Sequence, residues 1–296
     1  MTYIVVQFEY NNRQGMYTKL LRVFEQSVKE NDPGNDTVVK TIPPPRVRNN
    51  QCFSSNTLKL GVWVEEMEKL PEGHEICFID CDMMVLQPPN DVFELDFDIA
   101  YTKRPHKKTH RLPVNGGVVF CRNTEKARAF MKDWKSVNDK MFMDRKFHER
   151  WRKKYAGMNQ SAFGYLMEHP QDYTAKLVPV ECNTYNVCNE SWNKVGHDSD
   201  IRIVHIKSAL RKACTSGKCD NPQYKTAVLL WLGLYGRAGG PDIKLQMIPK
   251  HGKKGKRRNP IPAAKKKQSH IIIEGGDDEG ICDLTQRQNQ RRLHLP

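Results

Sequence analysis

EICFIDCDMMV, at residues 75–85, is the most strand-like stretch of the 296-residue chain. It is a short apolar run bounded by polar residues, which is typical of a buried strand. Because side chains alternate between the two faces of a strand, we expect Asp80 and Asp82 to lie on the same face. The stretch therefore predicts a buried strand that carries two neighbouring carboxylates near its end.

The sequence on both sides of this stretch alternates between short apolar runs and segments with apolar residues at helical spacing. The runs interpreted as strands are residues 3–8, 37–42, 98–102, 117–121, 175–180 and 201–206. The segments with helical spacing are residues 16–29, 56–70, 124–137, 158–167 and 226–235. This order predicts an α/β fold with a mostly parallel sheet flanked by helices. Ligands bind at the carboxyl ends of such strands, so the residues just after Phe8, Ile79 and Val119 are candidates for the chemistry.

The composition is that of a globular protein with an excess of positive charge. Hydrophobic residues make up 38% of the chain, which excludes a collagen or a wholly disordered protein. Lys and Arg number 48 against 34 Asp and Glu, giving a formal net charge of +14. Such a field attracts anions such as nucleic acids, nucleotides, sugar phosphates or anionic lipids, although solubility alone also explains a basic surface.

The composition changes near residue 250. Residues 250–296 hold twelve Lys and Arg and five Asp and Glu in a stretch with few apolar residues, which is typical of disorder. We therefore predict one folded domain over residues 1–249 and a basic, disordered tail over residues 250–296.

The two aspartates indicate a metal site. Adjacent carboxylates repel one another, and burying them without a partner is costly, so a divalent cation between them relieves both problems. Oxygen ligands suit Mg²⁺ or Mn²⁺, and such an ion can hold a diphosphate. The alternative is a strand end with two solvated aspartates, because a D-x-D sequence alone is common.

Several motifs succeed one another in a recognisable order. They are an N-terminal strand followed by a tyrosine loop, then NTLKLGVW (56–63), FIDCDMMVL (78–86), VNGGVVFCRNT (114–124), GMNQSAF (157–163) and VHIKSA (204–209). This order resembles that of nucleotide-sugar glycosyltransferases with the GT-A fold, and it is most similar to family 8 and its relatives. The resemblance covers about residues 3–210. It implies a Rossmann-like, mixed and mostly parallel sheet and a hexosyl- or pentosyltransferase whose donor is a nucleotide sugar such as a UDP-sugar.

The resemblance also assigns site residues. It implies that Asp80 and Asp82 contact Mn²⁺ or Mg²⁺ and the sugar diphosphate, with His205 as the third metal ligand. A neutral imidazole at a strand end suits this role, although a single histidine is more often structural. Lys207, two residues later, is expected to reach the leaving phosphate, and Gln160 is a catalytic candidate that contacts the donor sugar. Asn159 stands where the family more often has Asp.

Further residues are implied to bind the nucleotide and the sugar. Phe8 and Tyr10 follow the first strand, where the family stacks an aromatic side chain on the base, and Arg13 is expected near the phosphates. Lys59, in NTLKL, matches a basic residue that points toward the diphosphate. Asn115 and Gly116 precede a strand, where a backbone with little side chain can approach the sugar. Each of these residues could instead have a structural role without ligand binding. Tyr10 would then be a half-buried loop aromatic, Lys59 part of a solvated helix face, and Asn115 and Gly116 a simple turn.

Two basic segments bear on the acceptor. The first begins at Lys103 and ends at Arg111 (KRPHKKTHR), directly before the NGG sequence. The second is residues 145–155 (RKFHERWRKKY), which runs from Arg145 to Tyr155 and mixes cations with aromatic residues, a combination that suits phosphates and exposed bases. We therefore expect DNA, for example phage DNA with hydroxymethylated bases, as an acceptor.

Other readings remain open. Lipopolysaccharide, another polysaccharide, a glycolipid or a protein could accept the sugar instead, and the chain could be a nucleic-acid-binding protein without activity. A nucleotidyl- or phosphotransferase is disfavoured because no P-loop sequence is present. No convincing general base for an inverting reaction stands out, which favours retention slightly.

The sequence also predicts where the protein works. The first ten residues lack a basic segment with a cleavage site, and no apolar run approaches the roughly 18 residues of a membrane helix. The nine cysteines are an odd number, and the Cys182/Cys188 and Cys214/Cys219 spacings do not match a zinc knuckle. We therefore expect no membrane span, reduced thiols and a cytoplasmic location, in the host cell if a phage encodes the chain.

Overall fold

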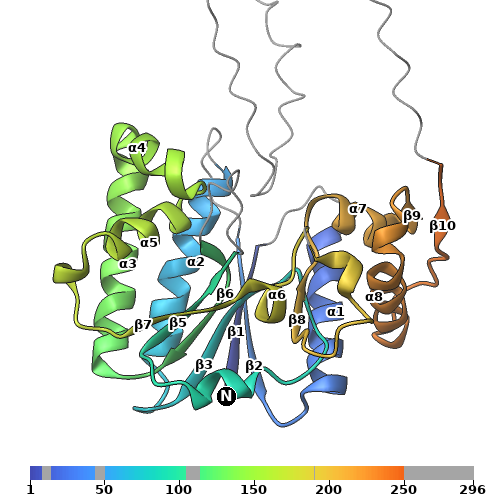
Figure 1. Ribbon diagram of the computed structural model, residues 1–296, viewed down its shortest axis with the longest axis horizontal. Coiled ribbons are helices and arrows are strands. Elements are labelled where there is room, and N and C mark those ends of the chain that lie inside the picture. The colour runs from blue at the N-terminus through green and yellow to red at the C-terminus, as the bar shows by residue number, and fades with distance from the viewer. Residues whose placement is uncertain (9–14, 44–50, 105–113, 190, 250–296) are drawn as a thin grey trace, which may run out of the picture.

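The computed structural model describes residues 1–8, 15–43, 51–104, 114–189 and 191–249, with the backbone alone described for residues 51–54. A six-stranded sheet forms its centre (Figure 1). In order across the sheet, the strands are β2 (Asp36–Ile42), β1 (Thr2–Phe8), β3 (Glu75–Asp80), β6 (Val114–Arg122), β5 (Ile99–Lys103) and β7 (Leu177–Glu181). Only β6 pairs antiparallel with its neighbours, so the predicted mixed, mostly parallel sheet is confirmed.

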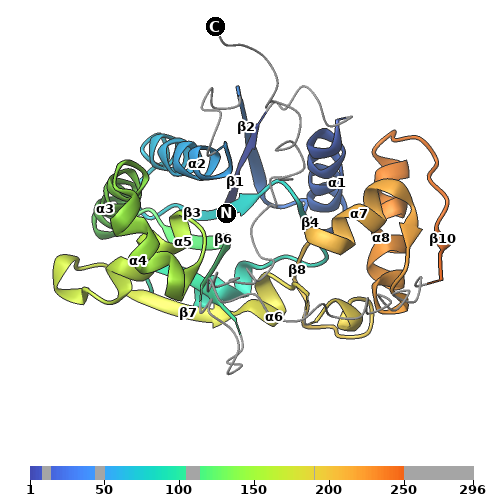
Figure 2. The same cartoon turned by 90° about the horizontal axis from the view of Figure 1, so that it is seen from above.

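Helices cover both faces of the sheet. They are α1 (Met16–Asn31), α2 (Gln51–Met67), α3 (Glu125–Met143), α4 (Arg145–Tyr155), α5 (Asn159–Met167), α6 (Cys182–Tyr185), α7 (Ser208–Ser216) and α8 (Lys225–Arg237). Short 3-10 turns lie at Asn90–Glu94, Pro170–Asp172, Trp192–Lys194 and Pro222–Tyr224. Figures 1 and 2 show α2, α3 and α5 on one side of the sheet and α1, α7 and α8 on the other.

The alternation along β3 explains this layering. Ile76 and Phe78 point into a core shared with α2, α3 and α5, whereas Cys77 and Ile79 point into a core shared with α1. All four side chains are fully buried because helices cover both faces, which is why the strand reads as a continuous apolar run. The same rule places the next residue, Asp80, on the face that α2 covers.

The predicted strand over residues 75–85 is not continuous. β3 ends at Asp80, residues 81–82 form a turn, and β4 (Met83–Val85) leaves the central sheet to pair antiparallel with β8 (Ile203–His205). Cys81 and Asp82 therefore lie at a corner between two sheets. The alternation argument for a shared face of Asp80 and Asp82 was wrong, because it assumed an unbroken strand.

The other predicted elements are present with shifted ends. α2 begins at residue 51 instead of 56, and α3 continues to residue 143 instead of 137. The segments with helical spacing did not include α4, α6 or α7, and the apolar runs did not include the two-residue strands β9 (Lys218–Cys219) and β10 (Gln246–Met247). Within the described ranges, no helix is both long and apolar enough to cross a membrane. The predicted tail over residues 250–296 lies outside the described residues.

Candidate active site

The carboxyl edge of the sheet collects the polar residues that the sequence singled out. Because β1, β3, β5 and β7 run parallel, their last residues meet at this edge, and the antiparallel β6 begins there with Val114. Asp80 is the last residue of β3. The turn that follows β3 directs Asp82 inward, so that only 6% of this residue is exposed.

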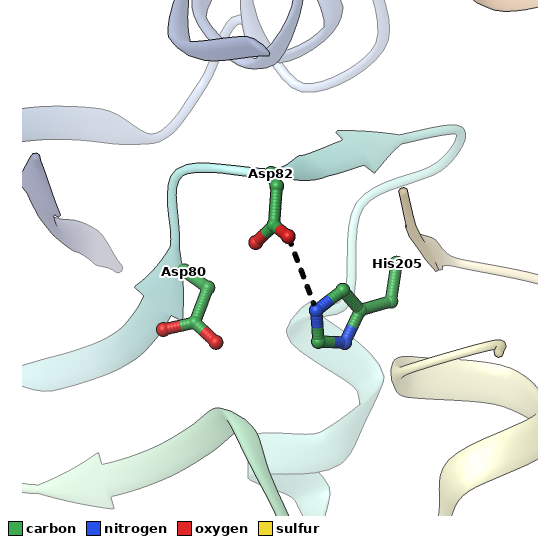
Figure 3. Close-up of side chains that lie close together, drawn as sticks. All are labelled: Asp80, Asp82 and His205. Atoms are coloured by element: carbon green, nitrogen blue, oxygen red, sulfur yellow. Dashed lines mark ion pairs between the residues drawn. The ribbon is translucent and has the colours of Figure 1, made fainter. Parts of the chain in front are cut away.

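His205 joins the two aspartates from the other sheet. It ends β8 and lies opposite Met83 in the β4–β8 pair, beside the turn that carries Asp82. One ligand atom from each of Asp80, Asp82 and His205 lies within 4.8 Å of the others (Figure 3). His205 Nε2 lies 3.5 Å from Asp82 Oδ2. The fold thus gathers the three predicted metal ligands.

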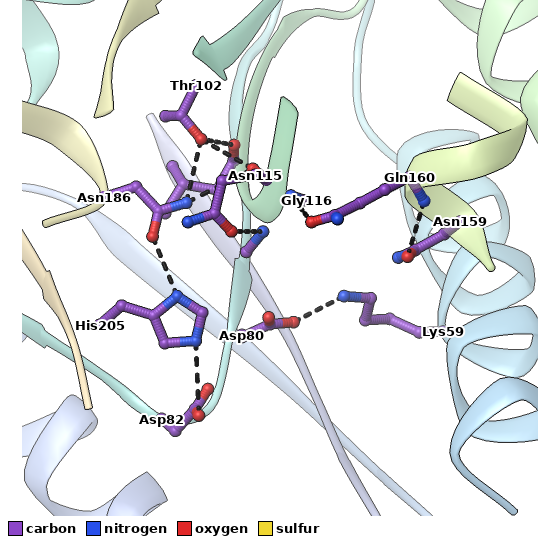
Figure 4. A network of polar contacts seen from close by, with 12 residues as sticks. Lys59, Asp80, Asp82, Thr102, Asn115, Gly116, Asn159, Gln160, Asn186 and His205 are labelled. Carbon is purple, nitrogen blue, oxygen red and sulfur yellow. Dashed lines mark hydrogen bonds and ion pairs between the residues drawn. The ribbon is translucent and has the colours of Figure 1, made fainter. Parts of the chain in front are cut away.

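A buried chain of hydrogen bonds orients the imidazole ring (Figure 4). The Thr102 hydroxyl donates to the Asn115 carbonyl at 2.7 Å and accepts from Asn186 Nδ2 at 2.9 Å. The side-chain amide oxygen of Asn186, Oδ1, therefore faces His205 and accepts from Nδ1 at 3.0 Å. In the neutral ring this bond holds the proton on Nδ1 and leaves the lone pair of Nε2 turned toward Asp82, as in many metal-binding histidines.

Gly117 makes room for this ring. A Cβ atom at Gly117 would lie 2.7 Å from Met83 Cε and 2.8 Å from His205 Cε1, which is too close for either contact. At Gly116 the nearest atom to such a Cβ is the flexible Cγ of Gln160, at 3.3 Å. The second glycine of the NGG sequence is therefore required by the packing of His205, whereas the first is not.

Two cations neutralise the aspartates. Lys59 of α2 is 6% exposed and its Nζ lies 2.6 Å from Asp80 Oδ1. Arg211 of α7 donates to Asp82 Oδ2 and to the Ile206 carbonyl, the latter at 3.1 Å. Burial alone would raise the pKa of Asp82, but Arg211 and His205 hold it well below its usual range. Burial would likewise lower the pKa of Arg211, yet the Asp82 carboxylate raises it.

The donor set fits a divalent cation. Two carboxylates and one imidazole are hard and borderline ligands that suit Mn²⁺ and, for the oxygens, Mg²⁺. His205 Nε2 and Asp82 Oδ2 face each other at 3.5 Å, and because Nδ1 is directed to Asn186, Nε2 would be the nitrogen that binds a cation placed beside the carboxylate. The residues present therefore fit a metal site.

The start of β6 is tied to α5. Gly116 N donates to Gln160 Oε1 at 2.9 Å, and Gly117 N donates to Asn115 Oδ1 at 3.3 Å. Gln160 Nε2 in turn donates to the Tyr155 carbonyl at 3.3 Å. Asn115 and Gln160 are 3% and 4% exposed, so both amides lie beneath the edge rather than on an open surface.

The remaining predicted residues are placed less fully. Tyr10 and Arg13 lie outside the described residues. Phe8 is half-buried at the end of β1, and it packs against the core beneath α2. Lys207, which was expected to reach the leaving phosphate, does not continue the strand: β8 ends at His205, and Lys207 is the buried residue that precedes α7.

The second basic segment forms α4. Its aromatic side chains turn inward: Phe147 and Trp151 pack edge-on against Tyr165 of α5, with ring centroids 5.4 and 5.1 Å apart, and Tyr155 is buried. The expectation that these aromatic residues stack on exposed bases is therefore wrong, because they belong to the protein core. The outward face is cationic, with Arg145, Lys146, Arg150, Arg152, Lys153 and Lys154 exposed. Of the first basic segment, residues 105–111 lie outside the described residues.

Sequence reasoning missed Arg211, Asn186 and Gly117. Arg211 lies on the unrecognised helix α7, and 129 positions separate it from Asp82. Asn186 is a single amide in a short segment after β7. Only the NGG sequence carried a signal, and that signal was assigned to an approach of the sugar rather than to the packing of His205.

Comparisons with known proteins indicate the family of the chain. The sequence profile described as nucleotide-diphospho-sugar transferase matches residues 68–213, a range that contains both aspartates, His205 and Arg211. No curated protein matches the chain.

Among solved structures, a glycosyltransferase involved in the glycosylation of the major capsid of PBCV-1 is similar, with a TM-score of 0.50, 14% identity and coverage of 71% of this chain and 95% of that chain. The galactosyltransferase LgtC, solved with donor and acceptor sugar analogues, has a TM-score of 0.50 at 8% identity, with coverage of 84% and 98%. At such identities the likeness concerns the fold.

Proposed function

The chain belongs to the nucleotide-diphospho-sugar transferases and is a glycosyltransferase with the GT-A fold, and on this premise we propose that it is a metal-dependent enzyme whose donor is a UDP-sugar. One observation carries the proposal: the convergence of Asp80, Asp82 and His205 within 4.8 Å at the carboxyl edge of the sheet. Asp80 ends a strand, Asp82 lies in the turn after it, and His205 ends a strand of a second sheet, so three separate elements must meet to build this cluster. Two solvated aspartates would not need such an arrangement.

The surrounding cations suit a diphosphate. Arg211 and Lys59 hold the aspartates through charge-assisted bonds. With a metal ion held by the aspartates, Arg211 and Lys59 would be available to bind phosphate oxygens, which suits the bidentate guanidinium and the point charge of the ammonium group. Lys207 lies next to the same edge and is proposed as a third cation for the diphosphate. Phe8, Tyr10 and Arg13 are proposed to hold the base and its phosphates.

The reaction breaks the bond between the anomeric carbon and the diphosphate while an acceptor oxygen bonds to that carbon. When bound, the metal neutralises the negative charge that develops on the leaving diphosphate. Arg211 and Lys59 add fixed positive charge beside the same leaving group, which lowers the barrier because this charge appears only as the bond breaks. Asn115 Oδ1 and Gln160 Oε1 each accept one internal hydrogen bond, and we propose that they position the sugar through their second acceptor site, with Gly116 holding Gln160 in place.

The outward face of α4 supports an anionic acceptor. It presents six exposed Lys and Arg side chains, and the helix leads directly to Gln160 through the Tyr155 carbonyl. Phosphates of a nucleic acid bind such faces through charge and counterion release. We propose DNA with hydroxymethylated bases as the first acceptor to test, with lipopolysaccharide and protein glycans as the alternatives.

The test is release of nucleoside diphosphate from a panel of nucleotide sugars with Mn²⁺, with and without each acceptor. The proposal expects release from a UDP-sugar that needs Mn²⁺ and rises with one acceptor. A rise with hydroxymethylcytosine DNA supports the DNA acceptor, and a rise with a glycan or lipid alone refutes it. No release from any donor, together with DNA binding that is the same in the wild type and Asp82→Ala, would leave a nucleic-acid-binding protein instead.

A further inference from the structure

Two buried thiols lie beneath the histidine of the site. Cys182 begins α6 and Cys188 follows the segment that carries Asn186, and they are 1% and 4% exposed. Asn115 Nδ2 lies 3.7 Å from both sulfur atoms, so one amide group contacts the two thiols together. The single proton of the Cys182 thiol is within reach of two acceptors, the backbone carbonyl of Asn186 at 3.0 Å and the sulfur of Cys188.

The two thiols differ in character. The hydrogen bond from Cys182 lowers the pKa of Cys188, and the positive charges of Lys207 and Arg104 lower it further against the effect of burial. The same hydrogen bond, together with burial, raises the pKa of Cys182. Burial also raises the pKa of other described thiols, those of Cys77, Cys81, Cys121 and Cys214. Thiolate character favours attack by an oxidant, and a neighbouring thiol can then resolve the oxidised sulfur as a disulfide, whereas burial slows the first step.

We propose that Cys182 and Cys188 form a disulfide on exposure to hydrogen peroxide, and that this bond weakens metal binding at His205. The Cys188 thiolate attacks one peroxide oxygen, so that a sulfur–oxygen bond forms as the oxygen–oxygen bond breaks, giving a sulfenic acid and hydroxide. The Cys182 sulfur then bonds to the sulfenic sulfur and expels its oxygen as water, which takes the thiol proton. The peroxide gains the two electrons that the sulfur pair loses.

The bond reaches the site through Asn186 and Asn115. The disulfide spans about 2.05 Å between sulfurs, which is shorter than any contact between separate thiols, so the two side chains must shift from the positions in which both contact the Asn115 amide. Cys182 also loses the proton that it offers to the backbone carbonyl of Asn186, which fixes the backbone from which the Asn186 side chain reaches His205. Asn186 is the residue that holds Nδ1 of His205, at 3.0 Å, so displacing it releases the ring from its orientation. Loss of such a supporting bond typically lowers metal affinity by about 10- to 100-fold.

The experiment treats the wild-type protein with stoichiometric hydrogen peroxide, blocks the remaining thiols and identifies disulfide-linked peptides by mass spectrometry. The Cys182–Cys188 disulfide should form before any other described cysteine is oxidised, and dithiothreitol should reverse it. The Mn²⁺ dissociation constant should rise about tenfold on oxidation and return on reduction. In Cys188→Ala the peroxide should leave this constant unchanged, whereas the matched variant Cys214→Ala should respond as the wild type does.

Three results would overturn the proposal: no disulfide, equally fast oxidation of another described cysteine, or a disulfide that leaves the Mn²⁺ dissociation constant unchanged. If Cys188→Ala fails to fold, the alkylation rate of each cysteine in the wild type decides, because Cys188 must react fastest at neutral pH. Only the metal readout rests on the proposed function. A protein that forms the disulfide and binds Mn²⁺ but never consumes a nucleotide sugar would refute the proposed function and leave this inference standing.

Discussion

Gly117 sets how closely β6 approaches the ring of His205. A side chain there would need the space that Met83 Cε and His205 Cε1 occupy, at 2.7 and 2.8 Å from the added atom. At this residue, therefore, the requirement for glycine comes from the ring of His205 on another strand and not from the local backbone, since the φ angle of Gly117 is not positive.

Gly117→Ala should weaken Mn²⁺ binding by at least about tenfold, because the new methyl group pushes His205 off its position. The adjacent Gly116→Ala should cost less, because only the flexible side chain of Gln160 lies within 3.4 Å of its new atom. Titration of Mn²⁺ by calorimetry, with thermal melts to confirm folding, measures both. Equal losses in the two variants would show that the packing against His205 is not what matters.

Ser208 begins α7 with a φ of 49°, in the left-handed region that disfavours side chains by roughly 1–2 kcal/mol. Ser208→Gly should therefore raise the free energy of unfolding by about 0.5–1 kcal/mol once the greater freedom of unfolded glycine is subtracted. Ser216→Gly, at the other end of the same helix, should lower it by about 0.5–1 kcal/mol. Urea denaturation of both variants gives the two signs, and a destabilised Ser208→Gly would contradict the strain.

Element patterns in the sequence predicted most of the fold. Leu20, Leu21, Phe24 and Val28 of α1 have helical spacing, and all four are buried as expected. Patterns failed where tertiary contacts decide the outcome. The apolar run over residues 75–85 continues past Asp80, but pairing with β8 draws residues 83–85 out of the central sheet, and no local signal records a partner about 120 residues away.

The junction of α4 and α5 predicts a dependence of stability on pH. His148 is 5% exposed, and its Nε2 donates to the Gly157 carbonyl at 2.7 Å. Burial lowers its pKa in spite of this hydrogen bond. The unfolded chain therefore takes up a proton more readily than the folded one. The contribution of His148 is fully present above its unfolded pKa of about 6.5 and is lost as the pH falls below that value toward the lower folded pKa.

His148→Gln keeps a donor for Gly157 but cannot titrate, so its stability should fall less than that of the wild type between pH 7.5 and pH 5. The exposed His197→Gln is the matched control and should follow the wild type. Urea midpoints at four pH values measure the three slopes. If His148→Gln keeps the wild-type slope, the buried ring does not govern this transition.

The whole molecule carries +14 formal charges, and α4 concentrates six exposed cations on one face. Replacing Lys146, Arg150 and Lys153 by Gln should weaken DNA binding and reduce the slope of log Kd against log salt by about one unit for each phosphate that the helix no longer binds. A triple control on exposed residues of α1 and α8, Arg22, Lys29 and Lys225 to Gln, keeps the same net charge. Fluorescence anisotropy at several salt concentrations measures both proteins. Equal slopes in the two triples would assign binding to overall charge and not to α4.

The candidate site was only partly visible in the sequence, and the reason is distance along the chain. Asp80 and Asp82 are neighbours in sequence, so their motif stands out. His205 was recognised through resemblance, because a single histidine carries no local pattern. Arg211 and Asn186 were not found, because only their contacts identify them as site residues: Arg211 contacts Asp82, and Asn186 contacts His205. Such contacts exist only after the two sheets have met.

The most direct test of the account is calorimetric titration of UDP into the protein with and without Mn²⁺. UDP should bind far more tightly with Mn²⁺ in the wild type, and Asp82→Asn and His205→Ala should each abolish this difference. Asp96→Asn is the matched control. Asp96 is exposed, lies before β5 at the opposite edge of the sheet and forms an ion pair with Lys176. The variant should bind UDP as the wild type does. Binding of UDP that ignores Mn²⁺, or that survives in both site variants, would contradict a metal site built from Asp80, Asp82 and His205.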